Sequence, residues 1–194
     1  MKQLSIALAL FCVLLWSWAE FFRAIPHLQE SGVLKNFKLS SVAAFQTEVT
    51  VLNKRFVKPQ RQVLHQASPY VGHFNDLAYV SNIDVLVTQK SLPNMSAKLT
   101  FDQPRRCFKV EGQLSAAEQA VIQQQVQHLS VIAANAQIAN QIRRLKAGQR
   151  IQLQGDIVHV HSVKSGQAFW VGVGSAYAAQ CVLLRITHIQ KIAA

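Results

Sequence analysis

The first two dozen residues constrain this chain most, because they form a hydrophobic segment that a folded domain does not need for its core. Residues 4–19 contain no charged side chain, with Lys2 before them and Glu20 after them. Sixteen residues are short for a bilayer span, which takes about 20. Phe21 and Phe22 nearly close that gap.

Two interpretations of this segment are open. In the first it is a retained membrane anchor, in which Trp16, Trp18 and the two phenylalanines form an aromatic belt at the membrane interface. In the second it is a cleaved signal peptide, with Ser17 and Ala19 at the small-residue positions of a cleavage site. Both interpretations place the rest of the chain outside the cytoplasm.

The remaining roughly 170 residues suit one domain. Half of all residues are apolar, so a real core can form and wholesale disorder is excluded. We therefore expect an anchor or signal peptide over 1–23, a tether over 24–41 and a single α+β domain over 42–194.

Alternating apolar and polar residues predict several strands. Residues 42–57 alternate, with Phe45, Thr47, Val49 and Val51 on one face, as in a half-buried strand. Further strands are expected within the apolar run 83–87 and over 97–101 and 106–110.

Two helices are expected between these strands and the C-terminal part. Ser115 and Glu118 have the spacing of a capping box, and apolar residues at helical spacing follow, which predicts a helix over 116–129. Asn135 precedes a second apolar stripe, which predicts a helix over 136–146 that Gly148 ends.

The last 44 residues are predicted to be all-β. Three alternating runs begin at Arg150, Gln167 and Cys181, and Gly155 and Gly166 fit a bulge and a turn. This pattern predicts a three-strand meander like part of a small OB or SH3 barrel.

Cys107 and Cys181 both fall in strand-like runs, outside the N-terminal segment. In an oxidising compartment they could form a disulfide, which would close a long loop and stabilise the fold by about 4 kcal/mol in the chain-entropy model. The alternative is two separate buried thiols. Without a CxxC spacing, neither zinc binding nor redox chemistry is indicated.

The chain is basic, with 20 Lys and Arg against 9 Asp and Glu. Such a balance favours anionic partners, namely nucleic acid, polysaccharide or lipid headgroups, or it serves solubility alone. No aromatic side chains interleave with the basic clusters as in a base-stacking platform. The candidate anion-binding residues are Lys54, Arg55, Arg105, Arg106, Arg143 and Arg144.

His159 and His161 are two residues apart on a predicted strand, so they share a face, as two metal ligands would. A third ligand would come from His73, Asp156 or His188, or else the two histidines simply face solvent. No catalytic set is evident, and we expect neither a cofactor nor a small-molecule substrate.

The C-terminal part resembles a family of uncharacterised bacterial membrane-associated proteins that face the periplasm. The resemblance rests on an Asn before a short helix, a basic residue-x-Gly that ends the helix, a Gly-centred strand, a Trp-containing strand and a late Cys. An upstream Asp-Leu-Ala element adds to it. The matching residues here are Asn135, Ile138 to Leu145, Lys146 to Gly148, Leu153 to Gly155, Trp170, Cys181 and Asp76 to Ala78.

This chain departs from the family pattern at two places. An Asn-x-His-x-Ile-Pro-like stretch is replaced by the sequence from Asn135 to Ala139, and a polar run after the Trp is replaced by Val171 to Ala179. A function that those polar residues carry in relatives would therefore be lost here. The resemblance implies an architecture and a location at the bacterial inner membrane, without an activity.

Three hypotheses for the function follow. The first is a non-enzymatic, membrane-tethered periplasmic protein that acts as an accessory or assembly subunit through protein–protein contacts. The second is a basic OB-like module that binds an anionic polymer. The third is a small envelope hydrolase, for which the nine scattered carboxylates provide no evident acid–base pair.

Overall fold

The computed structural model describes residues 2–21, 25–59, 76–92 and 98–192. Its helices are α1, α2, α3 and α4, with two short 3-10 helices, η1 and η2. They span Lys2–Phe21, Ser31–Asn36, Ala116–Gln125 and Ala136–Arg143, then Leu77–Tyr79 and Ala178–Gln180. The strands β1 to β8 span Phe37–Phe56, Ile83–Thr88, Lys98–Asp102, Cys107–Glu111, Val126–Ala133, Arg150–Ser162, Ala168–Phe169 and Cys181–Lys191.

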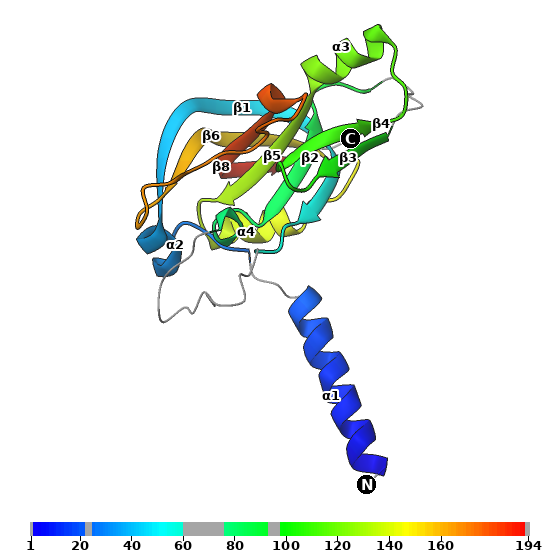
Figure 1. The fold of residues 1–194 in the computed structure, drawn as a ribbon, viewed down its shortest axis with the longest axis vertical. Helices are drawn as coiled ribbons and strands as arrows, with labels where there is room; N and C mark the ends of the chain where they lie inside the picture. Colours follow the sequence, from blue (N-terminus) through cyan, green and yellow to red (C-terminus); the bar gives the residue numbers. More distant parts are fainter. Residues whose placement is uncertain (1, 22–24, 60–75, 93–97, 193–194) are drawn as a thin grey trace.

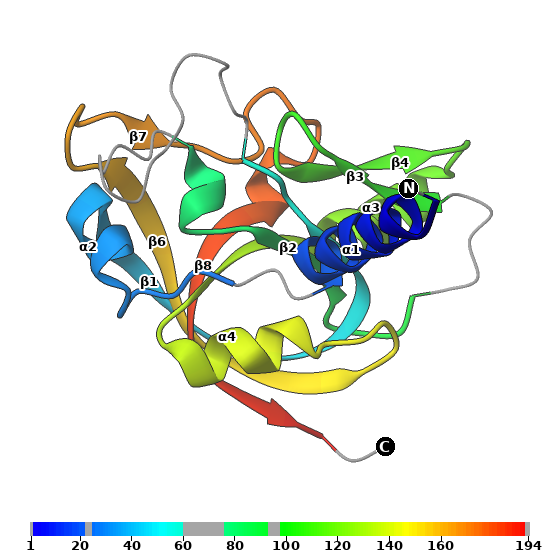
Figure 2. The ribbon, with the colours of Figure 1, turned by 90° about the horizontal axis from the view of Figure 1, so that it is seen from below.

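Strands β1, β2, β5, β8 and β6 close into a barrel through the β1–β6 pairing, and Figures 1 and 2 show its arrangement. The sheet order is β1-β2-β5-β8-β6-β7, and β1 pairs with β6 as well as with β2. The first part of β1, Phe37 to Thr50, pairs with β6, and the last part, Thr50 to Phe56, pairs with β2. The β5–β8 pair is parallel and every other pair is antiparallel. A strand of 20 residues can serve both neighbours because its two halves lie along different parts of the barrel wall.

The barrel interior is filled by alternate side chains of each strand. In β2, for example, Ile83, Val85 and Val87 belong to the main hydrophobic cluster, and each is 0–1% exposed. Helix α4 contributes Ile138 and Ile142 to this same cluster. The period-2 alternation of the strands and the helical spacing of α4 thus converge on one core.

Helix α4 begins as the sequence predicts but ends earlier. The Asn135 side chain accepts a hydrogen bond from the Ile138 amide at 3.0 Å, which satisfies a free N–H of the first turn. The helix ends at Arg143 rather than at 146. Gly148 then turns the chain at a φ of 80°, and its amide donates to the Val51 carbonyl at 2.8 Å.

The β3–β4 hairpin and α3 form an insertion between β2 and β5, and the hairpin lies over these two strands (Figure 1). A separate hydrophobic cluster joins it to the barrel wall. Phe108 of β4 stacks on Tyr177 with ring centroids 4.6 Å apart, and Leu86 of β2 packs in the same cluster. The predicted strands at 97–101 and 106–110 are confirmed within one residue of their ends.

The predicted helix over 116–129 is correct at its start and wrong at its end. The capping box is present, with the Ser115 side chain and Glu118 bonded reciprocally. The helix stops at Gln125, and β5 begins at Val126. Residues 126–133 pair with β2 and β8 on both sides, so tertiary pairing overrides the helical spacing of Val126 and Leu129.

Strands β6, β7 and β8 lie in one sheet, but not in the order of a meander. β6 lies between β8 and β7, and β8 pairs with β6 and β5. The expected bulge is present at Gly155, where the β6–β8 register shifts. A Cβ there would overlap the Arg185 carbonyl oxygen, so this close approach of two strands requires glycine.

The domain begins earlier than the sequence suggests. Residues 31–36 form α2, and residues 37–41, assigned to the tether, are the start of β1. Val33 and Phe37 are 2–3% exposed in a hydrophobic cluster with Val160 of β6. Serines in this stretch favoured a linker, but Val33 and Phe37, which lie between them in the sequence, are buried.

Helix α1 lies away from the barrel (Figure 1). Its described side chains, from residue 4 to 15, include eight large hydrophobic residues that are each more than half exposed. These are Leu4, Ile6, Leu8, Leu10, Phe11, Val13, Leu14 and Leu15. Within the described part of the chain, no helix has both the length and the apolar character required to cross a membrane.

Candidate functional site

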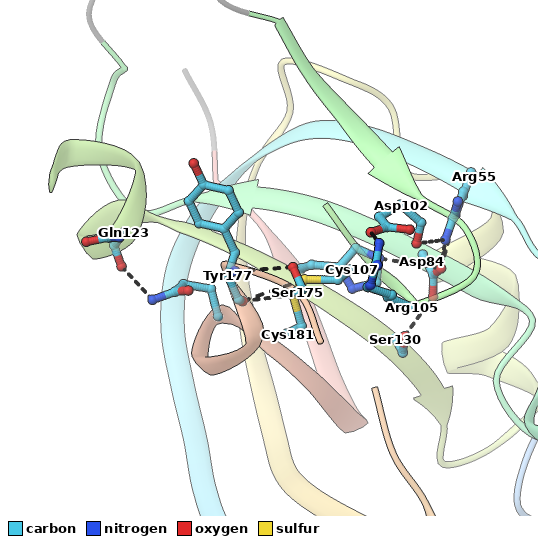
Figure 3. The surroundings of a disulfide bond; sticks show 12 residues. Arg55, Asp84, Asp102, Arg105, Cys107, Gln123, Ser130, Ser175, Tyr177 and Cys181 are labelled. Atoms are coloured by element: carbon cyan, nitrogen blue, oxygen red, sulfur yellow. Dashed lines mark hydrogen bonds and ion pairs between the residues drawn. A yellow bond between two sulfur atoms is a disulfide. The ribbon is translucent and has the colours of Figure 1, made fainter. Parts of the chain in front are cut away.

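A buried polar cluster surrounds Asp84 on the outer wall of β2, beneath the β3–β4 hairpin. The Asp84 side chain is completely buried. Its Oδ1 accepts hydrogen bonds from Arg106 Nη2 at 2.7 Å and from Ser130 Oγ at 2.8 Å. Its Oδ2 accepts from Arg55 Nη2 at 2.8 Å and from Arg55 Nε at 3.1 Å. Strands β1, β2 and β5 and the hairpin thus meet at one carboxylate (Figure 3).

Arg106 reaches this carboxylate from the turn of the hairpin. It has a φ of 49°, a left-handed conformation that costs an ordinary side chain energy. Its Nη2 also donates to Ser81 Oγ at 3.0 Å. This buried ion pair links the turn of the hairpin to the barrel, and loss of either partner would leave an uncompensated charge beneath the hairpin.

Charge decides the protonation state of Asp84. Burial by itself raises the pKa of a carboxyl group, but the Arg106 charge and the nearby His128 ring outweigh it and hold the pKa of Asp84 well below its usual range. A buried carboxylate that two guanidinium groups bind is a poor proton donor or acceptor. Its role is therefore structural.

An aromatic layer closes the cluster on the hairpin side. The Phe101 ring lies edge-on to the fully buried His128 ring, with centroids 5.7 Å apart, and the Arg55 guanidinium lies 4.7 Å from the Phe101 centroid. His128 Nε2 is 3.4 Å from Asp84 Oδ2. Phe101 therefore separates the ionic cluster from solvent and adds a cation–π contact.

A disulfide fixes the same hairpin to the barrel at a second point. Cys107 of β4 and Cys181 of β8 are bonded, with their Cα atoms 5.4 Å apart (Figure 3). Cys181 lies directly beside His128 in the β5–β8 ladder. The sequence left open a disulfide or two separate buried thiols, and the structure contains the disulfide. Arg106 and Cys107 are consecutive, so the ionic contact and the covalent bond hold adjacent residues.

The candidate anion-binding residues are mostly occupied by internal contacts. Arg55 and Arg106, distant in sequence, meet at Asp84. Arg105 Nη1 donates to Asp102 Oδ2 at 2.9 Å. Lys54 Nζ donates to the Arg143 carbonyl at 2.6 Å, at the C-terminal end of α4, where a cation is favoured. Burial lowers the pKa of Lys54.

Only Arg143 and Arg144 of that set keep their guanidinium groups without a partner among the described residues. Arg143 is half-buried and Arg144 is exposed. They lie at the end of α4, where the Arg143 carbonyl accepts the hydrogen bond from Lys54 Nζ. Four of the six basic candidates are therefore engaged within the chain, and Arg143 and Arg144 are the two whose guanidinium groups have no partner among the described residues.

The histidine pair lies on the outer face of β6. His159 is exposed and His161 is half-buried, and His159 packs against the exposed Trp170 with ring centroids 5.2 Å apart. Asp156 is paired with Arg185. His73 lies outside the described residues. The described residues contain no group of three or more His, Cys, Asp or Glu side chains placed to hold a metal ion.

Each carboxylate whose side chain is described has a partner within the chain. Glu30 pairs with His27, Glu48 with Arg150, Asp102 with Arg105, Glu111 with Lys109 and Asp156 with Arg185. Asp76 and Glu118 cap helices, and Asp84 is buried. Not every positive charge has such a partner: Lys35 and Lys38 are exposed without an ion pair among the described residues.

Sequence reasoning missed the Asp84 cluster. The signal was a single carboxylate inside an otherwise apolar strand, Ile83 to Val87, which requires a buried counter-charge. The partners could not be identified, because Arg55, Arg106 and Ser130 lie on three other segments.

No protein-family model matches the chain, and a search of curated proteins finds no match.

Proposed function

We propose that this protein is a non-enzymatic accessory or assembly subunit that acts by binding another protein outside the cytoplasm. The internal use of its carboxylates carries this proposal. Acid–base catalysis needs a carboxylate or histidine that can exchange a proton with a substrate. Here the most perturbed carboxylate, Asp84, is sealed beneath a hairpin and neutralised by Arg55 and Arg106.

Two features support a location outside the cytoplasm. The Cys107–Cys181 disulfide is typical of an oxidising compartment. The exposed apolar side chains of α1 fit a membrane-targeting segment, whether it stays as an anchor or is removed as a signal peptide. Both features support the proposal of a periplasmic domain, at the inner membrane or released from it.

A second candidate is supported by the barrel topology. In chain order the barrel strands are β1, β2, β5, β6 and β8, arranged first-second-third-fifth-fourth and closed by the first–fourth pair, with α4 between the third and fourth. This connectivity supports an OB-type barrel, a fold that often binds oligonucleotides or oligosaccharides across its second and third strands. A basic OB-like module for an anionic polymer remains the alternative.

The occupied outer wall of β2 and β5 favours protein binding over polymer binding. An OB-type barrel would use this wall for a polymer, and here its outward side chains Asp84, Leu86, His128 and Ser130 are 0–1% exposed. The hairpin that covers them is fixed by a disulfide and an ion pair. A polymer would therefore need a different surface of this barrel.

Crosslinking of the tagged full-length protein in cells tests the proposal, with purification and mass spectrometry at low and high salt. We expect a defined protein partner that survives high salt. Recovery of polymer or lipid alone, lost at high salt, would favour the second candidate, because phosphate contacts release counterions. Turnover of an envelope polymer by the purified protein would contradict both.

A further inference from the structure

The first half of β1 has an unpaired edge. From Phe37 to Val49 this strand pairs with β6 along one edge, and β2 begins to pair with the other edge only at Thr50. Along the second edge no described strand pairs with these residues. Figure 1 shows this part of β1 curving around the outside of β6.

The hydrogen-bond pattern identifies the peptide groups that face this edge. Val51 donates to the Gln149 carbonyl at 2.9 Å and accepts from the Gly148 amide at 2.8 Å, so its peptide groups point toward β6. Peptide groups of an antiparallel strand alternate in direction. Ala44, Gln46 and Glu48 therefore direct their N–H and C=O groups to the unpaired edge.

The side chains along this edge leave it accessible. Ala43, Ala44, Gln46 and Glu48 are all exposed, and Val42, at the register shift of the β1–β6 pair, is 55% exposed. Natural edge strands are usually protected by Pro, by several charges or by a covering segment. The stretch from Leu39 to Gln46 contains neither a Pro nor a charged residue.

The charges beside this edge indicate the chemistry of a segment that could bind there. Lys35 of α2 and Lys38 of β1 are exposed beside the start of this edge, and neither has an ion pair among the described residues. The chain's described carboxylates are paired with basic side chains or cap helices, so none of them is paired with Lys35 or Lys38. An added segment therefore meets unmatched positive charge, which favours Asp and Glu in that segment.

Resting on the proposed protein-binding function, we infer that the unpaired edge of β1, from Leu39 to Glu48, binds an extended acidic segment of the partner protein by strand addition. The backbone of Ala44, Gln46 and Glu48 supplies the hydrogen bonds, and Lys35 and Lys38 attract the acidic side chains. Strand addition needs only the backbone of the partner for affinity, and the flanking charges provide its selectivity.

The first test is site-specific crosslinking in cells with the full-length protein. A photoreactive residue replaces Gln46, and a control version carries it at the exposed His188 of β8. We expect Gln46 alone to crosslink to a segment rich in Asp and Glu within one partner. A crosslink between two copies of this chain, or to polymer, would overturn the inference.

The second test uses the variant Ala44→Pro, which removes an edge-facing N–H without removing a bond to β6. We expect at least a tenfold loss of the partner crosslink and of partner recovery, with the thermal unfolding midpoint kept within a few degrees. Lys38→Glu should reduce the recovery of the partner more strongly at low salt than at high salt. Full recovery of the partner with both variants would show that the partner binds a different surface of the domain.

Hydrogen exchange distinguishes failure of the strand-addition proposal from failure of the proposed protein-binding function. In the free protein, the amides of Ala44, Gln46 and Glu48 should exchange quickly and those of Phe45, Thr47 and Val49 slowly. The partner should slow the first set. A partner that is recovered without this change leaves the protein-binding function standing and rejects the edge, whereas absence of any protein partner rejects both.

Discussion

The β2–β5 wall and the first half of β1 differ in how their polar groups are paired and covered. On the β2–β5 wall, the hairpin and a disulfide cover the outward side chains, and the Asp84 carboxylate is paired with Arg55 and Arg106. On the first half of β1, exposed side chains flank peptide groups that no described strand pairs. The charged residues of the covered wall therefore maintain the fold, whereas small uncharged residues of β1 form the accessible surface.

The largest effect is expected for Asp84→Ala. Removing this carboxylate leaves the buried Arg106 and the partly buried Arg55 charged without their shared partner, which should lower the free energy of unfolding by about 3–5 kcal/mol. Urea unfolding measures it. Asp156→Ala is the matched control, since the Asp156–Arg185 pair is partly exposed and should cost about 1 kcal/mol or less. Equal losses of stability for the two variants would mean that the buried Asp84 cluster contributes no more than a partly exposed ion pair.

The next largest effect is expected on loss of the disulfide. The double variant Cys107→Ser, Cys181→Ser should lower the free energy of unfolding by about 2–5 kcal/mol, because the unfolded chain regains the freedom of a long loop. It should also speed amide exchange in β4. Cys12→Ser, which alters a cysteine outside the disulfide, should change neither quantity. Unchanged exchange in β4 would indicate that the ionic contacts alone hold the hairpin.

Acid should weaken the covered wall through Asp84. The pKa of Asp84 is lowered in the folded state, so its contribution to stability is complete above the unfolded pKa of about 3.9 and is lost as pH falls below it. Between pH 5 and pH 2 this single group should remove about 2–3 kcal/mol of stability. Urea unfolding at several pH values should give a shallower acid slope for Asp84→Asn, and parallel slopes would contradict the assignment.

The smallest effect should come from a pair of neighbouring proline variants in β1. Ala43 and Ala44 are both exposed, but the amide of Ala43 faces β6 and that of Ala44 faces the open edge. Ala43→Pro should cost about 1–3 kcal/mol through a lost ladder bond, and Ala44→Pro should cost less than about 1 kcal/mol. Thermal unfolding distinguishes them, and equal costs would show that both edges are paired.

Much of the local structure could be predicted because it depends on neighbours in sequence. The capping residues Ser115 and Asn135, the bulge at Gly155 and the strand around Val49 all follow from spacing within a few residues. The cysteine pair could be named as a possibility. Strand β5 could not be predicted, because its apolar spacing also fits a helix and only pairing with β2 and β8 selects the strand.

The sequence by itself determined the apolar N-terminal segment, the α+β class, the basic charge and the local caps and turns, since these depend on short-range stereochemistry and composition. Tertiary structure alone decided that β1 closes a barrel, that Arg55 and Arg106 converge on Asp84 and that one half of β1 keeps an open edge. The physical reason is that strand pairing and burial of charge join residues far apart in the chain, and no local pattern specifies which distant segments will meet.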